Sequence, residues 1–205
     1  MAQCETPQMS GSDGPPAHRV VLVRHGQTAW SASGQHTGRT DVPLTDTGRA
    51  QGAALAPALG RYRFVRISTS PLSRAVDTCR LALPDQPADV DPDLAEWDYG
   101  EYEGLTTVEI REIVPQWTVW THPCPGGESS AEVAARVDAV LTRCRHGDGD
   151  VLLVAHGHLL RVLSARWLGL EPAEGRLFLL DPATISVLAD DRGVPVISSW
   201  NSPIG

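Results

Sequence analysis

The stretch that decides the fold is Arg19-Val-Val-Leu-Val-Arg24-His25-Gly26-Gln27-Thr28. Its apolar, largely β-branched run from Val20 to Val23 predicts a strand that is buried on both faces. The run ends in a cation, an imidazole and a glycine. Because ligands in open α/β sheets bind just beyond the carboxyl ends of the strands, Arg24 and His25 stand where chemistry is expected. Gly26 would let the backbone approach a ligand or turn sharply.

Two further strand ends carry residues of the same kind. The apolar run 151–155 leads into His156-Gly157-His158, and the run 64–67 leads to Ser70-Pro-Leu-Ser-Arg74. A single Arg-His pair could simply mark the point at which a strand reaches the surface. Two strands that each deliver His-Gly, with an arginine from a third, instead predict that one edge of a sheet gathers these side chains.

Four blocks of the sequence resemble the signatures of the histidine phosphatase superfamily, which has the phosphoglycerate mutase-like fold. They follow the family's order over residues 19–190, and they are Arg24-His25-Gly26, Ser70-Pro-Leu-Ser-Arg74, Leu94-Ala-Glu96-Trp-Asp-Tyr-Gly100 and His156-Gly157. The resemblance implies an α/β fold of three layers, α/β/α, around a mainly parallel central sheet. Apolar runs at 185–189 and 194–199 predict a hairpin, and hence an antiparallel edge. We expect a single domain over residues 19–200.

Composition sets limits on the function. The chain has 205 residues, a hydrophobic fraction of 41% and a formal net charge of −8, so nothing points to nucleic acid or an anionic membrane as a partner. A phosphorylated substrate would therefore need a local basic pocket. Residues 1–18 are polar and rich in Pro, Gly and Ser, and we expect a disordered extension rather than a signal peptide. The four cysteines lack close metal-ligand spacing, which favours reduced thiols and a cytoplasmic location.

The remaining pattern predicts the other elements. Residues 29–41 are expected to form a long loop, and 89–94 a short strand. Helices are expected over 44–59, with Thr45 as the N-cap, over 71–83, opened by Pro71, and over 106–114, 130–145 and 157–168. Arg74 would lie in the first turn of its helix, where the dipole and the free N–H groups favour a bound anion. Trp117 and Trp120 are expected mainly in the core, with a pocket cap as the alternative.

The resemblance assigns catalytic roles to five residues. His25 would attack phosphorus with one ring nitrogen while a backbone carbonyl holds the other N–H, and a phosphohistidine would form and be hydrolysed by water. Glu96 would protonate the departing alkoxide. Arg24, Arg74 and His156 would surround the phosphate oxygens.

A second set of residues is expected to contact the substrate. Thr37 offers a hydroxyl and Gly38 a free N–H to phosphate oxygens, and the resemblance adds Ser31, Tyr99 and Gly157. Related mutases carry Asn in place of Ser31. No metal or cofactor is expected. His36 and His158 could suggest zinc together with His156, but His-x-His with one loop histidine is a weak pattern, and hydrogen bonding or exposure is the preferred interpretation.

Hydrolysis of small phosphomonoesters, such as sugar phosphates, is the expected activity. Trp97 and Asp98 stand where mutases carry basic residues for a second phosphate, and 104–125 is shorter than the insertion that closes a mutase pocket. The alternatives are a 2,3-bisphosphoglycerate-dependent phosphoglycerate mutase and a non-catalytic phosphate-binding module, which would usually have lost part of the catalytic set. An exposed edge strand could support a homodimer.

Overall fold

The computed structural model describes residues 18–145 and 149–204. Its centre is one six-stranded sheet in the order β3-β2-β4-β1-β5-β6. The strands are β1 (Arg19–Arg24), β2 (Phe64–Thr69), β3 (Asp89–Val90), β4 (Asp150–Ala155), β5 (Ile185–Asp191) and β6 (Val194–Ser202). Neighbours among β1 to β4 pair in parallel, and β5 pairs antiparallel with both β1 and β6. The expected mainly parallel sheet with an antiparallel edge is confirmed.

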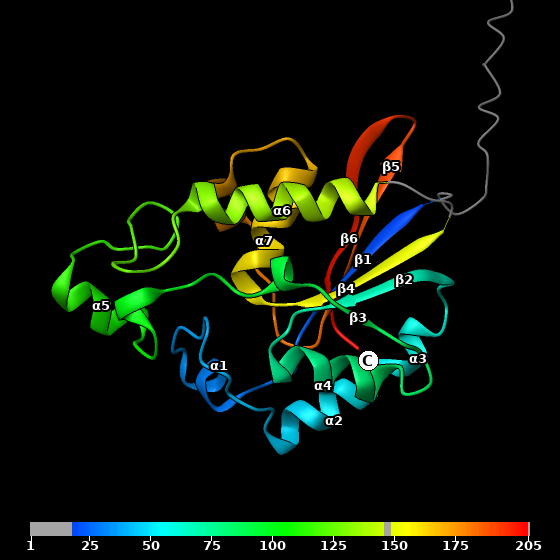
Figure 1. Ribbon diagram of the computed structural model, residues 1–205, viewed down its shortest axis with the longest axis horizontal. Helices are drawn as coiled ribbons and strands as arrows, with labels where there is room; N and C mark the ends of the chain where they lie inside the picture. The colour runs from blue at the N-terminus through cyan, green and yellow to red at the C-terminus, as the bar shows by residue number, and fades with distance from the viewer. Residues whose placement is uncertain (1–17, 146–148, 205) are drawn as a thin grey trace, which may run out of the picture.

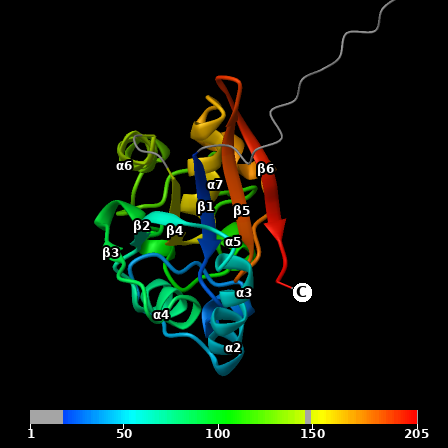
Figure 2. The same cartoon turned by 90° about the vertical axis from the view of Figure 1, so that its right-hand side faces the viewer.

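Helices cover both faces of the sheet and complete the three expected layers. In Figure 1, α6 (Ser130–Cys144) and α7 (Gly157–Trp167) lie on one side, and α2 (Asp46–Ala54), α3 (Ala56–Leu59) and α4 (Ser73–Ala82) lie on the other. Figure 2 shows the strands side by side between these helices. The short helix α5 (Thr107–Ile113) stands away from the sheet.

The alternating side chains of the strands divide the core into two parts. Val20 and Leu22 of β1 belong to the cluster under α6 and α7, whereas Val21 and Val23 belong to the cluster under α2, α3 and α4. The same alternation runs through β4. Because successive strand residues point to opposite faces, β1 and β4 must be apolar throughout, which is the pattern that predicted them.

Three expected elements differ in extent. The helix predicted over 44–59 is two helices, because Pro57 has no N–H to donate and its ring conflicts with the carbonyl four residues earlier. The strand predicted over 89–94 stops at Val90, and a 3-10 turn, η1 (Pro92–Leu94), follows. The expected long loop begins with a short helix, α1 (Ala29–Ser33), which a capping box between Thr28 and Ser31 starts.

The other helix starts follow the sequence signals closely. Thr45, Thr106 and Ser129 are N-caps whose side chains accept a hydrogen bond from the backbone three residues on. The helix expected from Pro71 begins at Ser73, after an extended Leu72. Two further 3-10 turns are present: η2 (Gly100–Tyr102) precedes α5 in the chain, and η3 (Pro172–Leu177) follows α7.

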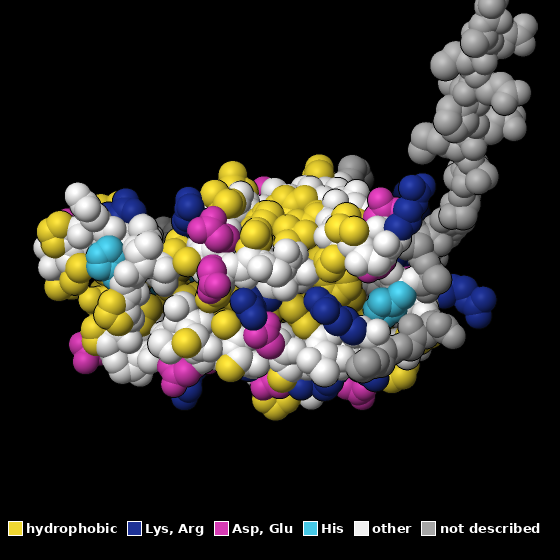
Figure 3. Space-filling model, turned by 90° about the horizontal axis from the view of Figure 1, so that it is seen from above, with side chains coloured by type: hydrophobic (Ala, Val, Ile, Leu, Met, Phe, Trp, Pro, Cys, Tyr) yellow, Lys and Arg dark blue, Asp and Glu magenta, His cyan; other side chains and the backbone are white. Residues whose placement is uncertain are grey.

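Of the predicted extension, only His18 lies within the described residues, where its Nδ1 is 2.7 Å from the carbonyl oxygen of Gly149. On the face that carries α6, acidic, basic and hydrophobic side chains are interspersed (Figure 3). In the described part of the chain, no helix is long and apolar enough to cross a membrane.

Candidate active site

Three strand ends meet at one edge of the sheet, because β4 lies between β1 and β2. The backbone continues the strand pairing for one residue beyond each end: His25 N donates to Ala155 O at 2.9 Å, and Ser70 N donates to Val154 O at 3.0 Å. The residue after β4, His156, is therefore placed beside His25, with ring centroids 5.1 Å apart. The structure therefore brings the two histidines together at one edge of the sheet, as the sequence predicted.

The His25 imidazole is buried and held as a single tautomer. Its Nδ1 lies 2.7 Å from the carbonyl oxygen of Gly26, to which it donates, so Nε2 keeps its lone pair. Burial, followed by the charges of Arg24 and Arg74, holds the pKa of His25 well below its usual value. The imidazole is therefore neutral at neutral pH, which is the form that can act as a nucleophile.

Arg24 brings an almost unused guanidinium to the site. Nη1 donates to Leu180 O, and Nε is buried with no hydrogen-bond partner among the described residues. Burial lowers the pKa of Arg24 and the Glu96 carboxylate opposes that effect, but an arginine keeps its proton under all ordinary conditions. A buried cation with uncommitted N–H groups favours an anionic ligand.

Arg74 uses its donors differently. It lies in the first turn of α4, as predicted, and its Nη atoms donate to the carbonyls of Thr37, Gly38 and Thr40 at 2.9–3.1 Å. The anion at the start of this helix is Asp41, whose carboxylate accepts from the Ser73 N–H at 2.9 Å. The structure thus places Arg74 as an anchor of the loop around the pocket, and part of the predicted anion site is filled from within the chain.

His156 is fully buried behind the reacting edge. Arg74 Nε donates to its Nδ1 at 3.3 Å, so Nε2 carries the proton and donates to Ser70 Oγ at 2.6 Å. Burial, with the charge of Arg74 next in importance, lowers the pKa of His156 well below its usual value. The single N–H of the neutral His156 ring is therefore used within the protein, on Ser70.

Glu96 lies at the N-terminus of α7. Its Oε1 accepts from the backbone N–H groups of Trp97 (2.9 Å) and Leu159 (2.8 Å), and Oε2 accepts from His158 N at 3.0 Å. The helix start thus offers its free N–H groups to this carboxylate. Oε2 has one protein donor and a lone pair left over, so it is the oxygen that can exchange a proton with a ligand.

A cavity of about 160 Å³ opens in front of these groups. Seven predicted residues line it: Arg24, His25, Ser31, Thr37, Glu96, Tyr99 and Gly157. Three others, Arg74, His156 and Gly38, lie outside its lining. A Cβ on Gly157 would come within 3.3 Å of the Arg24 guanidinium carbon, so this glycine allows the cation its place.

The expected phosphate donors of the loop are already in use. Gly38 N donates to Glu103 Oε1 at 2.8 Å, so the prediction of a free N–H there is wrong. The Thr37 hydroxyl donates to Gln35 O at 3.2 Å, and Tyr99 OH lies 2.6 Å from His158 Nδ1. Sequence reasoning could not detect these partners because they lie on distant segments or on backbone carbonyls.

Six residues of the cavity lining were not among the predicted site residues: Gly34, Gln35, His36, His158, Arg161 and Leu180. His36 and His158 stack at 5.8 Å between ring centroids, and burial lowers the pKa of His36 to about 4. Arg161 donates from Nε to Gly175 O at 3.0 Å and lies 4.6 Å from the ring centroid of Trp120. It could have been found, because it lies four residues after Gly157 and thus on the same face of α7.

Trp117 is buried in the core, as expected, and Trp120 packs against the same core.

The described parts of the chain, 18–145 and 149–204, contain no group of three His, Cys, Asp or Glu side chains arranged to hold a metal ion. The arrangement thus offers a neutral imidazole, arginine donors and a carboxylate around one small cavity. Such a set suits attack on a phosphoryl group.

Comparison with known proteins gives consistent results. A sequence model of the histidine phosphatase superfamily (branch 1) matches residues 20–203. An acid phosphatase of Mycobacterium tuberculosis is 48% identical over 181 residues, which cover 86% of this chain and 89% of that protein. A sedoheptulose 1,7-bisphosphatase of Saccharomyces cerevisiae is 36% identical, with 74% and 68% covered. The solved structure of an open reading frame from Mycobacterium tuberculosis superimposes with a TM-score of 0.86 at 43% identity, covering 92% of this chain and 99% of that one.

Proposed function

Because the chain belongs to the histidine phosphatase superfamily, we propose that it hydrolyses small phosphomonoesters through a phosphohistidine on His25, with Glu96 as the proton donor. The observation that carries the proposal is the hydrogen bond from His25 Nδ1 to Gly26 O. It leaves the Nε2 lone pair of a neutral imidazole at a cavity that Arg24 and Glu96 also line.

In the first step, the Nε2 lone pair forms a bond to phosphorus, and the bond between phosphorus and the ester oxygen breaks. The departing oxygen takes that electron pair and a proton from the Glu96 carboxyl group, so the alcohol leaves neutral. Arg24 stabilises the charge on the phosphoryl oxygens. Arg74 supports this step by holding the loop carbonyls and the His156 ring.

In the second step, a water oxygen attacks phosphorus and returns a proton to Glu96. The bond between phosphorus and Nε2 breaks, its electron pair returns to the imidazole, and inorganic phosphate leaves. The enzyme is then in its starting state, and the sum of the two steps is ester plus water giving alcohol plus phosphate. His25 keeps its Nδ1 proton throughout.

The surroundings of Glu96 favour a hydrolase over a mutase. Asp98 pairs with Arg39 at 2.6 Å, and Trp97 is buried with its Nε1 donating to the carbonyl of Glu128. These two residues therefore serve the structure and offer no cation for a second phosphate. Arg161, whose Nη1 donates to no group in the described residues, could receive a second anionic group on the same substrate.

We also propose a cytoplasmic location and leave a homodimer as a prediction. Cys79, Cys124 and Cys144 are free and buried, and burial raises the pKa of each thiol to about 11, which suits unreactive reduced thiols. Strand β6 lies at the edge of the sheet, where a second copy could pair. Sedimentation at several protein concentrations would test the association.

The test of the function is phosphate release from a panel of esters in the presence of a chelator. The panel contains sugar monophosphates and bisphosphates, 3-phosphoglycerate and p-nitrophenyl phosphate, and isomerised phosphoglycerate is assayed in parallel. Wild type should release phosphate, and His25→Ala should keep less than a few per cent of that turnover. Acid-labile phosphate on wild type, absent from His25→Ala, would identify the intermediate. Full turnover by His25→Ala would overturn the mechanism, and isomerisation without release would indicate a mutase.

A further inference from the structure

Glu96 lies in a segment of the backbone that has no regular secondary structure. After η1 ends at Leu94, residues 95–99 belong to neither a helix nor a strand. The carboxylate can occupy one position only if its backbone is fixed by other groups. A misplacement of about 1 Å in a catalytic group can cost roughly 100-fold in rate, so whatever fixes this backbone matters for the reaction.

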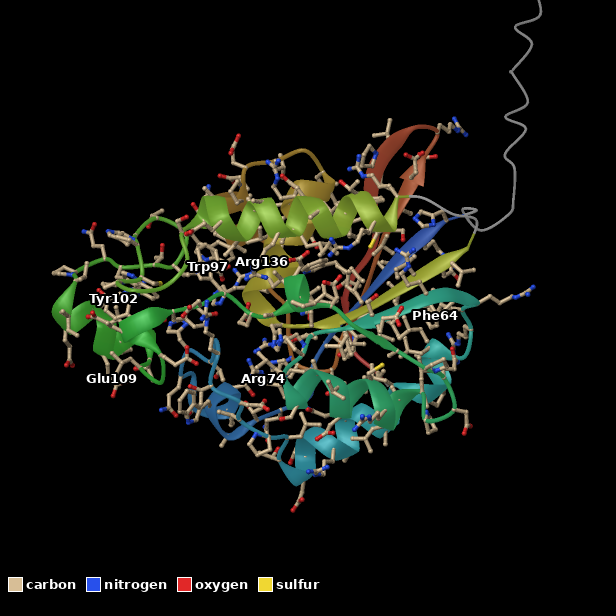
Figure 4. All side chains as sticks on the ribbon, viewed as in Figure 1. Phe64, Arg74, Trp97, Tyr102, Glu109 and Arg136 are labelled. Carbon is tan, nitrogen blue, oxygen red and sulfur yellow. The ribbon has the colours of Figure 1, made fainter. Side chains whose placement is uncertain are left out.

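Arg136 of α6 supplies much of that support. Its side chain, 14% exposed, points from the helix towards the segment that carries Trp97 (Figure 4). Nη1 donates to the carbonyls of Asp93 (2.8 Å) and Ala95 (2.6 Å), and Nη2 donates to that of Glu96 (3.2 Å). One guanidinium thus holds three carbonyls, one of them that of Glu96 itself.

Glu128 completes the arrangement from the other side. It pairs with Arg136 in a bidentate manner, Nε to Oε1 at 2.8 Å and Nη2 to Oε2 at 2.9 Å. Its Oε2 also accepts from the Asp98 N–H at 3.0 Å, and its carbonyl accepts from Trp97 Nε1 at 2.9 Å. The pair therefore makes hydrogen bonds to the chain on both sides of Glu96, at Asp93 and Ala95 before it and at Trp97 and Asp98 after it.

All five N–H donors of Arg136 are satisfied in this network: Nε by Glu128, Nη1 by two carbonyls, and Nη2 by Glu96 O and Glu128. A lysine has three donors on one atom and cannot reproduce a planar fork. We propose that Arg136 and Glu128 act as positioning residues that hold the Glu96 carboxyl group for proton transfer. This inference rests on the proposed function, in which Glu96 is the proton donor.

The test compares two esters that differ in their need for a proton. A sugar phosphate has a poor leaving group that must be protonated, whereas p-nitrophenolate departs without a proton. Because kcat/KM reports the first step, misplacing Glu96 should affect the two esters unequally. In Arg136→Lys and Glu128→Gln, kcat/KM for the sugar phosphate should fall roughly 10- to 100-fold, and that for p-nitrophenyl phosphate by less than about 3-fold.

Two further variants serve as references. Glu96→Gln removes the proton donor and gives the full effect on the ratio of the two rates. Asp138→Asn breaks another bidentate pair of the same helix, with Arg166 at 2.9 Å for both contacts, and should leave the ratio unchanged. If Arg136→Lys does not fold, Glu128→Gln carries the test, because it keeps the volume of the side chain and the contacts of Arg136 with the three carbonyls.

The outcomes separate this inference from the function on which it rests. A changed ratio in Arg136→Lys, Glu128→Gln and Glu96→Gln, but not in Asp138→Asn, supports the positioning role. A changed ratio in Glu96→Gln alone overturns the role of Arg136 and Glu128 and leaves the function intact. An unchanged ratio in Glu96→Gln means that Glu96 is not the proton donor, and both proposals then fail.

Discussion

The His25 imidazole depends on its immediate neighbours for both its tautomer and its charge. The carbonyl of Gly26 takes the Nδ1 proton, and burial beside Arg24 and Arg74 disfavours a second proton on the ring. A histidine in water would be half protonated near pH 6.5. Lowering the pKa keeps the nucleophile available in weakly acidic solution, where a free imidazole would be lost.

This argument predicts the titration of His25. In the free enzyme, the ring should stay neutral with its proton on Nδ1 as the pH falls through about 6.5, because burial and the neighbouring arginines hold the pKa of His25 well below that value. Nitrogen NMR of labelled imidazoles checks both points. Arg24→Met should raise the pKa of His25, since it removes the larger of the two charge effects. A wild-type titration near pH 6.5 would contradict the argument.

At the scale of elements, close backbone contacts set the distances around the site. Gly26 was expected to leave room for a ligand or a sharp turn, but the space is occupied by α2: a Cβ there would lie 2.4 Å from Gly48 O. A Cβ on Gly48 would lie 2.1 Å from Gln27 O. The start of α2 can therefore approach the segment after β1 only because both positions are glycine.

Gly48→Ala should therefore destabilise the protein by on the order of 3 kcal/mol, because the clash is with backbone that cannot move alone. Gly52→Ala, one turn later on the same helix, is the matched control. Its Cβ would meet the flexible Leu81 side chain at 3.2 Å, and alanine favours a helix by up to about 1 kcal/mol. Urea unfolding of both variants measures the difference. Equal stabilities would show that the contact at Gly48 is not limiting.

The loop 37–40 is held by a carboxylate from a distant segment. Glu103 Oε1 accepts from Gly38 N (2.8 Å) and Thr40 N (2.9 Å), and Oε2 accepts from Arg39 N (3.3 Å). The carbonyls of this loop in turn accept from Arg74. Glu103 therefore acts on the pocket through the loop rather than by contact with a ligand.

Glu103→Gln should raise KM by about tenfold with a smaller change in kcat, because an amide has one acceptor oxygen and turns its own N–H groups towards the loop. Steady-state kinetics on the best ester of the panel, and inhibition by inorganic phosphate, measure the effect. Glu101→Gln is the control, since Glu101 is exposed and lies two residues away. The same loss in both variants would argue against a specific role for Glu103.

At the scale of the whole molecule, the sequence predicts most reliably what a short stretch determines by itself. The buried strands and the residues at their carboxyl ends were predictable because strand order and periodicity bring His25, His156 and Arg74 to one edge. The use of the Gly38 N–H was not, because its partner Glu103 is 65 residues away. Pro57 indicates a break in the helix predicted over 44–59, but the residues on either side of it have a helical pattern, which favours one continuous helix.

The same three-dimensional assembly places four imidazoles at or beside one cavity: His25, His36 and His156, which are buried, and His158, which is partly buried. Burial is the leading cause of the lowered pKa in each. In the unfolded chain, a histidine takes up a proton as the pH falls through about 6.5, while the folded ring does not. Below that pH the unfolded state binds more protons, so the folded state must lose stability as the solution becomes acidic.

We therefore expect the free energy of unfolding to fall as the pH drops from about 6.5 to about 4, and His36 alone, with a pKa of about 4, should contribute about 3 kcal/mol of this loss. Urea unfolding at intervals of pH measures the free energy of unfolding.

His36→Gln should reduce the slope of this free energy against pH by close to one proton. Thr107→Val removes the 3.1 Å partner of His36 but keeps the imidazole, so it should lower stability without flattening the curve. Asp150, whose pKa is lowered by its Arg19 pair, affects stability only at still lower pH. Constant stability from about pH 6.5 to about pH 5 would show that these imidazoles accept protons in the folded protein.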